Sequence, residues 1–193
     1  MKALVIYHAN CTDGFTSAYV FSESRASAYE EVEYRPMAYG DIVHSIGIDR
    51  DVYILDFSFK RPEMRGICAY AKNVTVIDHH KTAQAELENW EDAPENLQII
   101  FDMAKSGAGL TWDTFHGVEE PRPALVNYVE DRDLWKFALA RSKDMNAYIN
   151  IRPWKFYAYK ELHDELEILP GDVVEVGKAL NEYTQQICNQ IAK

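Results

Sequence analysis

The segment Asn73-Val74-Thr75-Val76-Ile77-Asp78-His79-His80 decides how this chain is interpreted. Its residues 74–77 form a largely apolar, β-branched run, which is typical of a strand buried inside a parallel sheet. The run ends in one carboxylate and two imidazoles. In open α/β sheets, ligands bind beyond the carboxyl ends of the strands. The segment therefore predicts a buried strand that carries polar side chains to the edge of a sheet where chemistry takes place.

Two other strand-like runs end in the same way. Residues 2–7 lead into His8 and, five residues later, Asp13, and residues 51–55 lead into Asp56. Imidazole and carboxylate groups are common ligands of Zn, Mn, Fe and Mg ions. Because the carboxyl ends of parallel strands meet at one edge of a sheet, we expect these side chains to form a metal site there.

The apolar pattern predicts an α/β fold. Strands are expected at residues 2–7, 31–36, 51–57, 73–78 and 97–102. Helices are expected at residues 14–26, 41–46, 62–71, 107–115, 124–130 and 134–139. This alternation predicts a parallel five-stranded sheet with helices on both faces. The acidic segment 83–96 is interpreted as a solvated connection.

Strand signals stop near residue 140. Helical patterns continue at residues 144–151, 156–166 and 173–191. We therefore expect a catalytic domain at 1–140, followed by a helical C-terminal extension at 141–193.

Composition limits the possible partners. The chain has 193 residues, 47% of them hydrophobic, and a formal net charge of -11. That charge argues against binding of long duplex nucleic acid, but metal ions can supply local positive charge for a nucleotide. The three cysteines, Cys11, Cys68 and Cys188, form no disulfide or zinc pattern, so reduced thiols and a cytoplasmic location are expected. No apolar run has membrane-spanning length, so no membrane association is expected.

The ordered motifs resemble the DHH phosphoesterase superfamily, which is named after its Asp-His-His tripeptide. Four motifs carry the resemblance: residues 8–18, Asp56, residues 78–80, and Asp131 within residues 128–135. The superfamily includes RecJ-type exonucleases, nanoRNases, cyclic-dinucleotide phosphodiesterases and family II inorganic pyrophosphatases. The resemblance implies the strand order 2-1-3-4-5. The glycine-rich GGGH-type signature of the superfamily's C-terminal domain is absent from this sequence.

The resemblance also implies a centre of two divalent metal ions. Mn²⁺ is the expected ion, with Mg, Zn, Fe or Co as alternatives. The implied metal ligands are His8, Cys11, Asp13, Asp56, His79 and Asp131. Asp56 would bridge the two ions, and His80 would contact the substrate phosphate, so these two residues are the expected catalytic groups. Asp78 and Asn10 are expected behind the ligands, where Asp78 would orient an imidazole.

Two ligand assignments leave alternatives open. Cys11 stands where most members of the superfamily have an Asp, and a thiolate there would favour Zn, Fe or Co over Mg. Alternatively, the thiol stays neutral, and Asn10 or water fills the position. Asp133 competes with Asp131, which is preferred because the family's ligand tends to precede an aromatic residue by four positions, as Asp131 precedes Trp135. The alternative for both acids is a charged helix end.

A substrate contact is expected at Lys105, Ser106 and Gly107, which stand between a predicted strand and a predicted helix. Backbone N–H groups at a helix N-terminus suit phosphate. The alternative is an ordinary helix start, and the resemblance favours the substrate contact. Further basic residues beside the motifs are either phosphate ligands or solvated surface: Lys60, Arg61 and Lys81.

The resemblance implies a metal-dependent phosphoesterase that hydrolyses a small phosphodiester, such as a short oligonucleotide or a nucleotide. Cyclic-dinucleotide hydrolysis and pyrophosphate hydrolysis are alternatives. A third alternative is a non-catalytic nucleotide-binding protein that keeps the metal pocket. The C-terminal helices are candidates for a homodimer interface.

Overall fold

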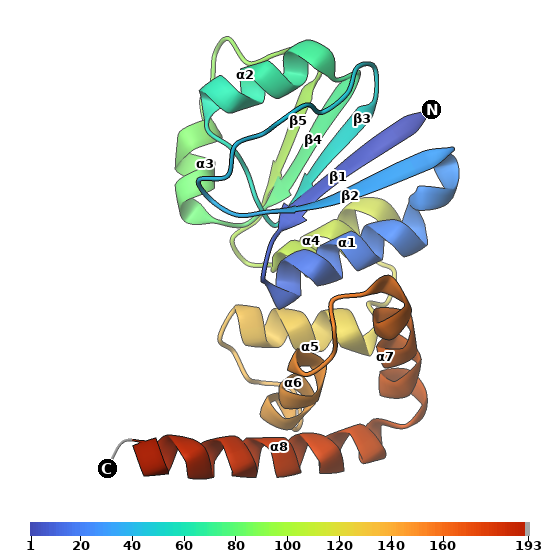
Figure 1. The fold of residues 1–193 in the computed structure, drawn as a ribbon, viewed down its shortest axis with the longest axis vertical. Helices are drawn as coiled ribbons and strands as arrows, with labels where there is room; N and C mark the ends of the chain where they lie inside the picture. Colours follow the sequence, from blue (N-terminus) through green and yellow to red (C-terminus); the bar gives the residue numbers. More distant parts are fainter. Residues whose placement is uncertain (192–193) are drawn as a thin grey trace. The chain divides into compact units, whose positions relative to one another are not determined.

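The computed structural model describes residues 1–191, and its N-terminal part is built on an open parallel sheet. The strands are β1 (Lys2–His8), β2 (Glu31–Met37), β3 (Asp51–Leu55), β4 (Asn73–Asp78) and β5 (Leu97–Phe101). They pair in the order β2-β1-β3-β4-β5, and every pair is parallel (Figure 1). The α/β fold class and the strand order implied by the resemblance are both confirmed.

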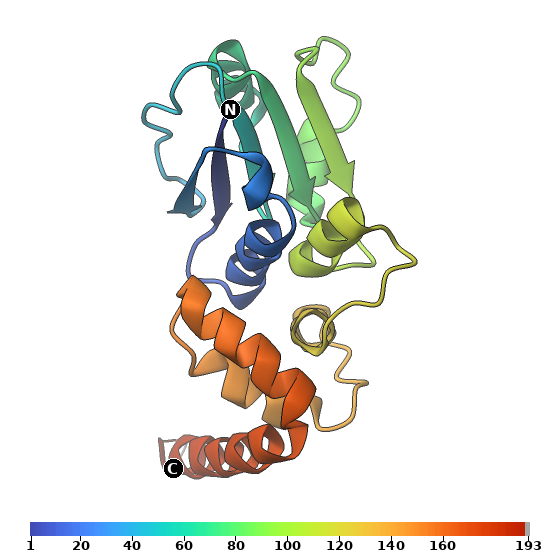
Figure 2. The ribbon, with the colours of Figure 1, turned by 90° about the vertical axis from the view of Figure 1, so that its right-hand side faces the viewer.

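Helices cover both faces of this sheet because its strands are apolar on both sides. Helices α2 (Arg61–Tyr70) and α3 (Lys81–Leu87) lie on one face, and α1 (Thr12–Ser24) and α4 (Gly107–His116) lie on the other (Figures 1 and 2). A short 3₁₀ turn, η1 (Ala26–Ala28), follows α1. Successive residues of a strand point to opposite faces of the sheet, so each strand contributes to two hydrophobic cores, one on each face. The α2 side buries Leu4, Ile6, Val52, Ile54, Val74 and Val76 with Met64 and Ile67, and the α1 side buries Val5, Leu55 and Ile77 with Phe21 and Leu110.

The chain divides into two compact units, Met1–Pro121 and the part that begins at Arg122. The second unit is helical, as expected for the C-terminal segment, and contains α5 (Ala124–Asp133), α6 (Ser142–Asn150), α7 (Phe156–Ile168) and α8 (Pro170–Ile191). Gly177 brings α8 against the α6 backbone, since a Cβ there would lie 2.0 Å from the carbonyl oxygen of Asp144. This division assigns α5 to the helical unit, whereas our expected boundary after residue 140 placed it with the sheet.

Two predicted helices are wrong. Residues 41–46 belong to a long loop between β2 and β3, in which Gly40, Gly47 and Asp49 have positive φ. Ile46 is the buried apolar residue of this stretch, and one anchor does not offset the cost of nucleating a helix. The predicted helix 134–139 is also a loop.

This second loop contains the residues Trp135 and Phe137, which adopt φ values of 54° and 45°. The Asp131 carboxylate accepts hydrogen bonds from the backbone N–H groups of Ala138 and Leu139, at 2.8 and 3.3 Å. These bonds turn the chain back toward the end of α5 instead of letting the helix continue.

Helix α3 corrects the interpretation of residues 83–96 as a solvated connection. Its Ala83 and Leu87 side chains are buried, Leu87 in the core on the α2 side of the sheet. Two buried residues at a spacing of four are too weak a pattern to outweigh the acidic composition of the segment.

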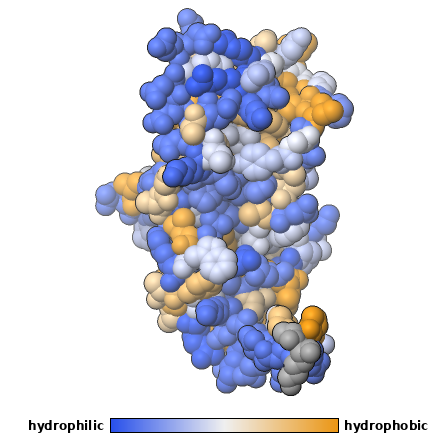
Figure 3. Space-filling view, turned by 90° about the vertical axis from the view of Figure 1, so that its left-hand side faces the viewer, coloured by the Kyte–Doolittle hydropathy of each residue, from blue (hydrophilic) through white to orange (hydrophobic). Residues whose placement is uncertain are grey.

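Hydrophilic side chains dominate the face shown in Figure 3, and hydrophobic side chains appear there in small separate groups. Along the described residues, the helices are all too short or too polar to cross a membrane.

Candidate metal centre

The candidate site lies where the order of strands reverses. From β1 the chain first adds β2 on one side and then returns to add β3 on the other side. Ligands of open α/β sheets bind at such a switch point, beyond the carboxyl ends of the strands. His8 ends β1, Asp56 directly follows β3, and Asp78 ends β4. Asp56 has φ 54°, so the chain leaves the sheet abruptly after β3 and turns this side chain into the site.

Asp56 is the central residue of the site. Its side chain is 1% exposed, and neither carboxylate oxygen accepts a hydrogen bond from the described part of the chain. The His79 Nε2 atom lies 3.1 Å from Oδ1, and the His8 Nδ1 atom lies 3.6 Å from Oδ2. Burial raises the pKa of the Asp56 carboxyl, but attraction to the imidazoles outweighs burial and lowers the pKa below its usual value.

An ionised, buried carboxylate without hydrogen-bond donors is costly unless it is paired or binds a metal. The His8 Nδ1 atom is likewise buried and lacks a hydrogen-bond partner among residues 1–191. The donor set around Asp56 consists of imidazoles, carboxylates and one thiol, which fits a divalent metal ion.

Two groups of ligand atoms share Asp56. One joins Asp56 to His8 and Cys11, and the other joins it to His79 and His80; within each group the ligand atoms lie within 4.8 Å of one another. Burial and the negative charges of the neighbouring acids raise the pKa of the Cys11 thiol to about 12. The thiol is therefore neutral in the metal-free protein. The structure brings together five of the six residues expected as ligands, because Asp13 also adjoins this cluster.

Asp13 links helices α1 and α4 beside the cluster. Its carboxylate oxygens accept hydrogen bonds from the backbone N–H groups of Gly107 and Ala108, at 2.6 and 2.9 Å. The His79 Nε2 atom lies 3.7 Å from Asp13 Oδ2. The side chain is 2% exposed, and the positive end of the α4 dipole favours its negative charge.

The residues expected to contact the substrate phosphate, Lys105, Ser106 and Gly107, make contacts within the protein. The Ser106 hydroxyl caps α4 by accepting a hydrogen bond from the Gly109 N–H at 3.1 Å. The Lys105 ammonium pairs with Asp113 at 2.9 Å and Asp102 at 3.4 Å. Since Asp13 holds the Gly107 N–H, substrate contact at these residues stays a prediction that would require rearrangement of their present partners.

Asp78 positions His80. One of its carboxylate oxygens lies 2.7 Å from His80 Nδ1 and also accepts hydrogen bonds from the backbone N–H groups of His79 and His80. Asp78 is fully buried. The hydrogen bond to Asp78 raises the pKa of the half-buried His80 imidazole above its ordinary value. Asp78 thus orients the His80 ring and favours its cationic form.

The turn between β1 and α1 contains residues whose roles are conformational. Asn10 is exposed and has φ 53°, a conformation that Asn tolerates well. A Cβ at Gly14 would lie 2.3 Å from the His8 carbonyl oxygen, so only glycine lets α1 pass so close to His8. A Cβ at Gly107 would similarly lie 2.5 Å from the Asp56 Cβ. Sequence reasoning missed these two close approaches, although the position of Gly14 directly after Asp13 was a usable signal.

Asp131 belongs to the helical unit, and its assignment as a ligand stays a prediction. Burial raises the pKa of this carboxyl, but hydrogen bonds from the Ser142 hydroxyl and the backbone N–H groups of Ala138 and Leu139 outweigh burial and lower it. These bonds show that Asp131 holds the loop after α5. Asp133, its competitor on the same helix, is half-buried.

No family model matches this chain. An uncharacterized protein of Acanthamoeba polyphaga mimivirus is 27% identical over 202 residues, which cover 98% of this chain and 46% of that protein. The chain thus spans less than half of this relative's length. An uncharacterized protein from Helicobacter pylori has a similar solved structure, with a TM-score of 0.66 at 14% identity over 95% of this chain and 62% of that chain. This likeness shows a shared fold. RecJ from Thermus thermophilus in complex with Mn²⁺ aligns with a TM-score of 0.48 at 14% identity, over 98% of this chain and 36% of RecJ.

Proposed function

We propose that this protein is a divalent-metal-dependent phosphoesterase that hydrolyses a small phosphodiester, such as a short oligonucleotide or a nucleotide. The observation that carries the proposal is the buried Asp56 carboxylate, which lacks hydrogen-bond partners within residues 1–191 and is surrounded by three histidines. The ordered motifs that resemble DHH phosphoesterases supply the reaction class.

The proposal assigns a role to each side chain. Asp56, His8 and His79, with Cys11 and Asp13 beside them, would hold two divalent ions, which we propose to be Mn²⁺. When bound, such ions polarise a phosphoryl oxygen and lower the pKa of water.

His80 is the proposed substrate-binding group. Because Asp78 raises its pKa, the imidazole favours the cationic form, which can attract a phosphate oxygen and stabilise the charge that develops in the transition state. Asp78 also fixes the ring through Nδ1, so the orientation of His80 is set before substrate arrives.

A second candidate is a nucleotide-binding protein that keeps the metal pocket without efficient turnover. The neutral, half-buried Cys11 thiol favours it, because a thiol in place of a carboxylate weakens the attraction for hard ions such as Mn²⁺. Multiple turnovers in the presence of metal would exclude this candidate.

The direct test is a hydrolysis screen in excess Mn²⁺, with a chelator control. The substrates are dinucleotides, cyclic dinucleotides, 3′-phosphoadenosine 5′-phosphate and pyrophosphate. Chelator-sensitive, multiple-turnover hydrolysis of a phosphodiester supports the proposal. Binding of nucleotides without turnover of any substrate supports the second candidate instead.

The roles of His80 and Asp56 can be separated by elemental analysis of metal content alongside the rate. His80→Ala should keep the metal and lose about 10²–10³ in rate, as expected for a lost transition-state contact. Asp56→Ala should lose both metal and rate. His116→Ala, at the exposed end of α4, is the matched histidine control and should change neither quantity. Loss of metal from His80→Ala would contradict the role given to this residue.

A further inference from the structure

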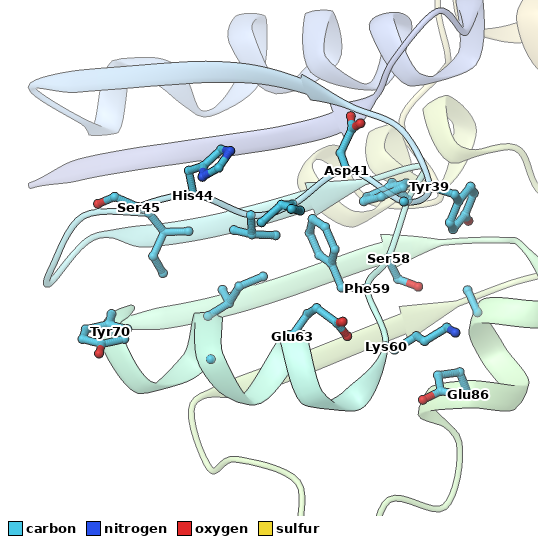
Figure 4. Close-up of a pocket in the computed structure, with 18 of the residues that line it drawn as sticks. Tyr39, Asp41, His44, Ser45, Ser58, Phe59, Lys60, Glu63, Tyr70 and Glu86 are labelled. Atoms are coloured by element: carbon cyan, nitrogen blue, oxygen red, sulfur yellow. The ribbon is translucent and has the colours of Figure 1, made fainter.

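A large cavity lies between the β2–β3 loop and helix α2, within the sheet unit. It has a volume of about 1110 Å³, slightly above the usual range of pockets that enclose small organic ligands. Aromatic and aliphatic side chains from the loop, from the segment after β3 and from α2 form much of its wall (Figure 4). These include Tyr39, Ile46, Phe57, Phe59 and Ile67.

The cavity adjoins the candidate metal centre. The Tyr39 and Phe57 rings both line the cavity and pack against each other, with their centroids 4.8 Å apart. The same two rings lie 5.6 and 6.0 Å from the His8 ring, and Tyr39 lies 6.1 Å from the His80 ring. A substrate whose phosphate is held near these histidines can therefore extend past Tyr39 into the cavity.

The charged groups of the cavity select against a second phosphate. Asp41, Glu63 and Glu86 contribute carboxylates, whereas Lys60 contributes the ammonium group. The Asp41 carboxylate accepts a hydrogen bond from the Ala38 N–H, and Glu86 accepts one from the Arg61 N–H. The Glu63 carboxylate makes no hydrogen bond or ion pair with other described residues, and Figure 4 shows it turned toward Phe59. It is thus available to accept hydrogen bonds from a ligand.

We propose that this cavity binds the organic group of the substrate, and that this group is a flat, uncharged ring with N–H donors, as in a nucleobase. The aromatic walls suit a flat ring, and Glu63 suits its N–H groups. This inference rests on the proposed function, because it takes the substrate phosphate to lie at the metal centre. It predicts discrimination against pyrophosphate, which has no such group.

Gly66 on α2 allows the cavity to be filled without disturbing the fold. It lines the cavity, and a Cβ built there meets nothing within 4 Å. Gly66→Leu should therefore place its side chain in open space, and replacement of a helical glycine also favours the helix. Ala69→Leu adds a leucine to the same helix at an exposed residue outside the cavity and is the matched control.

The first measurement is calorimetric titration of metal-free protein with adenosine, guanosine, cytidine and uridine, which carry the ring but no phosphate. The parent and Ala69→Leu should bind at least one nucleoside with similar affinity. Gly66→Leu should weaken that binding by about tenfold or more, the scale on which steric changes in apolar pockets act. Glu63→Gln should also weaken it, because an N–H donor loses a charged acceptor. Absence of nucleoside binding to the parent, or equal binding by Gly66→Leu, would overturn the cavity assignment.

The second measurement separates this inference from the proposed function. In Mn²⁺, Gly66→Leu should raise KM for a dinucleotide about tenfold relative to Ala69→Leu. Dinucleotide hydrolysis with the same KM in both variants would refute the cavity assignment and leave the phosphoesterase proposal standing. Nucleoside binding that Gly66→Leu blocks, without hydrolysis of any phosphoester by the parent, would refute the phosphoesterase proposal and leave the ring-binding cavity standing.

Discussion

Replacement of Asp56 by Asn should remove metal binding while leaving the metal-free fold intact. Asn has nearly the same shape as Asp and tolerates the positive φ of 54° at this position. The substitution removes the negative charge from a side chain that is 1% exposed and accepts no hydrogen bond from residues 1–191. In the metal-free protein, little structural stabilisation is therefore lost.

The expected magnitudes follow from this environment. At pH 8, the cost of burying the Asp56 charge opposes its attraction to the facing imidazoles, so the net stabilisation that is lost with the charge is small. We therefore expect the unfolding free energies of metal-free parent and Asp56→Asn to agree within about 1 kcal/mol. Mn²⁺ at about 100 times its dissociation constant should stabilise the parent by about 2.7 kcal/mol. For a chain of 193 residues, that corresponds to a rise in Tm of about 5–10 °C.

The assay is thermal unfolding at pH 8, with a chelator and with Mn²⁺, for the parent, Asp56→Asn and Asp49→Asn. Asp49 is a matched control because it also has positive φ, 57°, but is exposed. Asp49→Asn should keep the full Mn²⁺-dependent shift, and Asp56→Asn should lose it. An unchanged shift in Asp56→Asn, or a loss of several kcal/mol in its metal-free form, would show that the carboxylate is a structural group and refute this reasoning.

Three further substitutions test other parts of the molecule. Gly177→Ala should lower the unfolding free energy by about 1–3 kcal/mol in urea titrations, because the added Cβ would overlap the α6 backbone. Gly171→Ala is the control: a Cβ at Gly171 meets nothing within 4 Å, so its unfolding free energy should stay within about 0.5 kcal/mol of the parent. Asp131→Asn should lower the free energy of unfolding by about 1–3 kcal/mol, because it weakens the hydrogen bonds that hold the loop after α5. Calorimetric titration of Asp131→Asn and Asp133→Asn with Mn²⁺ decides which of the two acids is the ligand. Cys11→Asp should tighten Mn²⁺ binding in metal titrations, because a hard carboxylate replaces a neutral thiol; unchanged affinity and metal preference would show that Cys11 only packs.

The sheet and the clustering of the site were predictable because both depend on short-range patterns. Continuous apolar runs identified the strands, and the polar residues that follow them identified the edge of the sheet at which they meet. The resemblance added the strand order, and that order places His8 and Asp56 at the carboxyl ends of two adjacent strands. Five predicted ligands came together because each stands within six residues of a strand end.

The two wrong helices have a different cause. Residues 134–139 appear helical when taken alone, but the Asp131 carboxylate captures the N–H groups of Ala138 and Leu139. A side chain thus competes with the helix for its backbone donors, and no local propensity scale records that competition. The loop at 41–46 is held to the core by the buried Ile46 and by Val43, which packs against the same cluster. In both segments, contacts with residues outside the predicted helix determine the observed conformation.

The arrangement of helices explains how the Asp56 carboxylate is held without hydrogen-bond partners among residues 1–191. The backbone of α1 presses against His8 at Gly14, and the backbone of α4 presses against Asp56 at Gly107. Asp13 then ties the two helices together through the α4 N-terminus. These close backbone approaches pack the His8 and Asp56 side chains tightly, so their positions are set by the surrounding helices. The fold therefore gathers these acidic side chains and imidazoles by itself, and the metal ion that we propose would meet groups already held together.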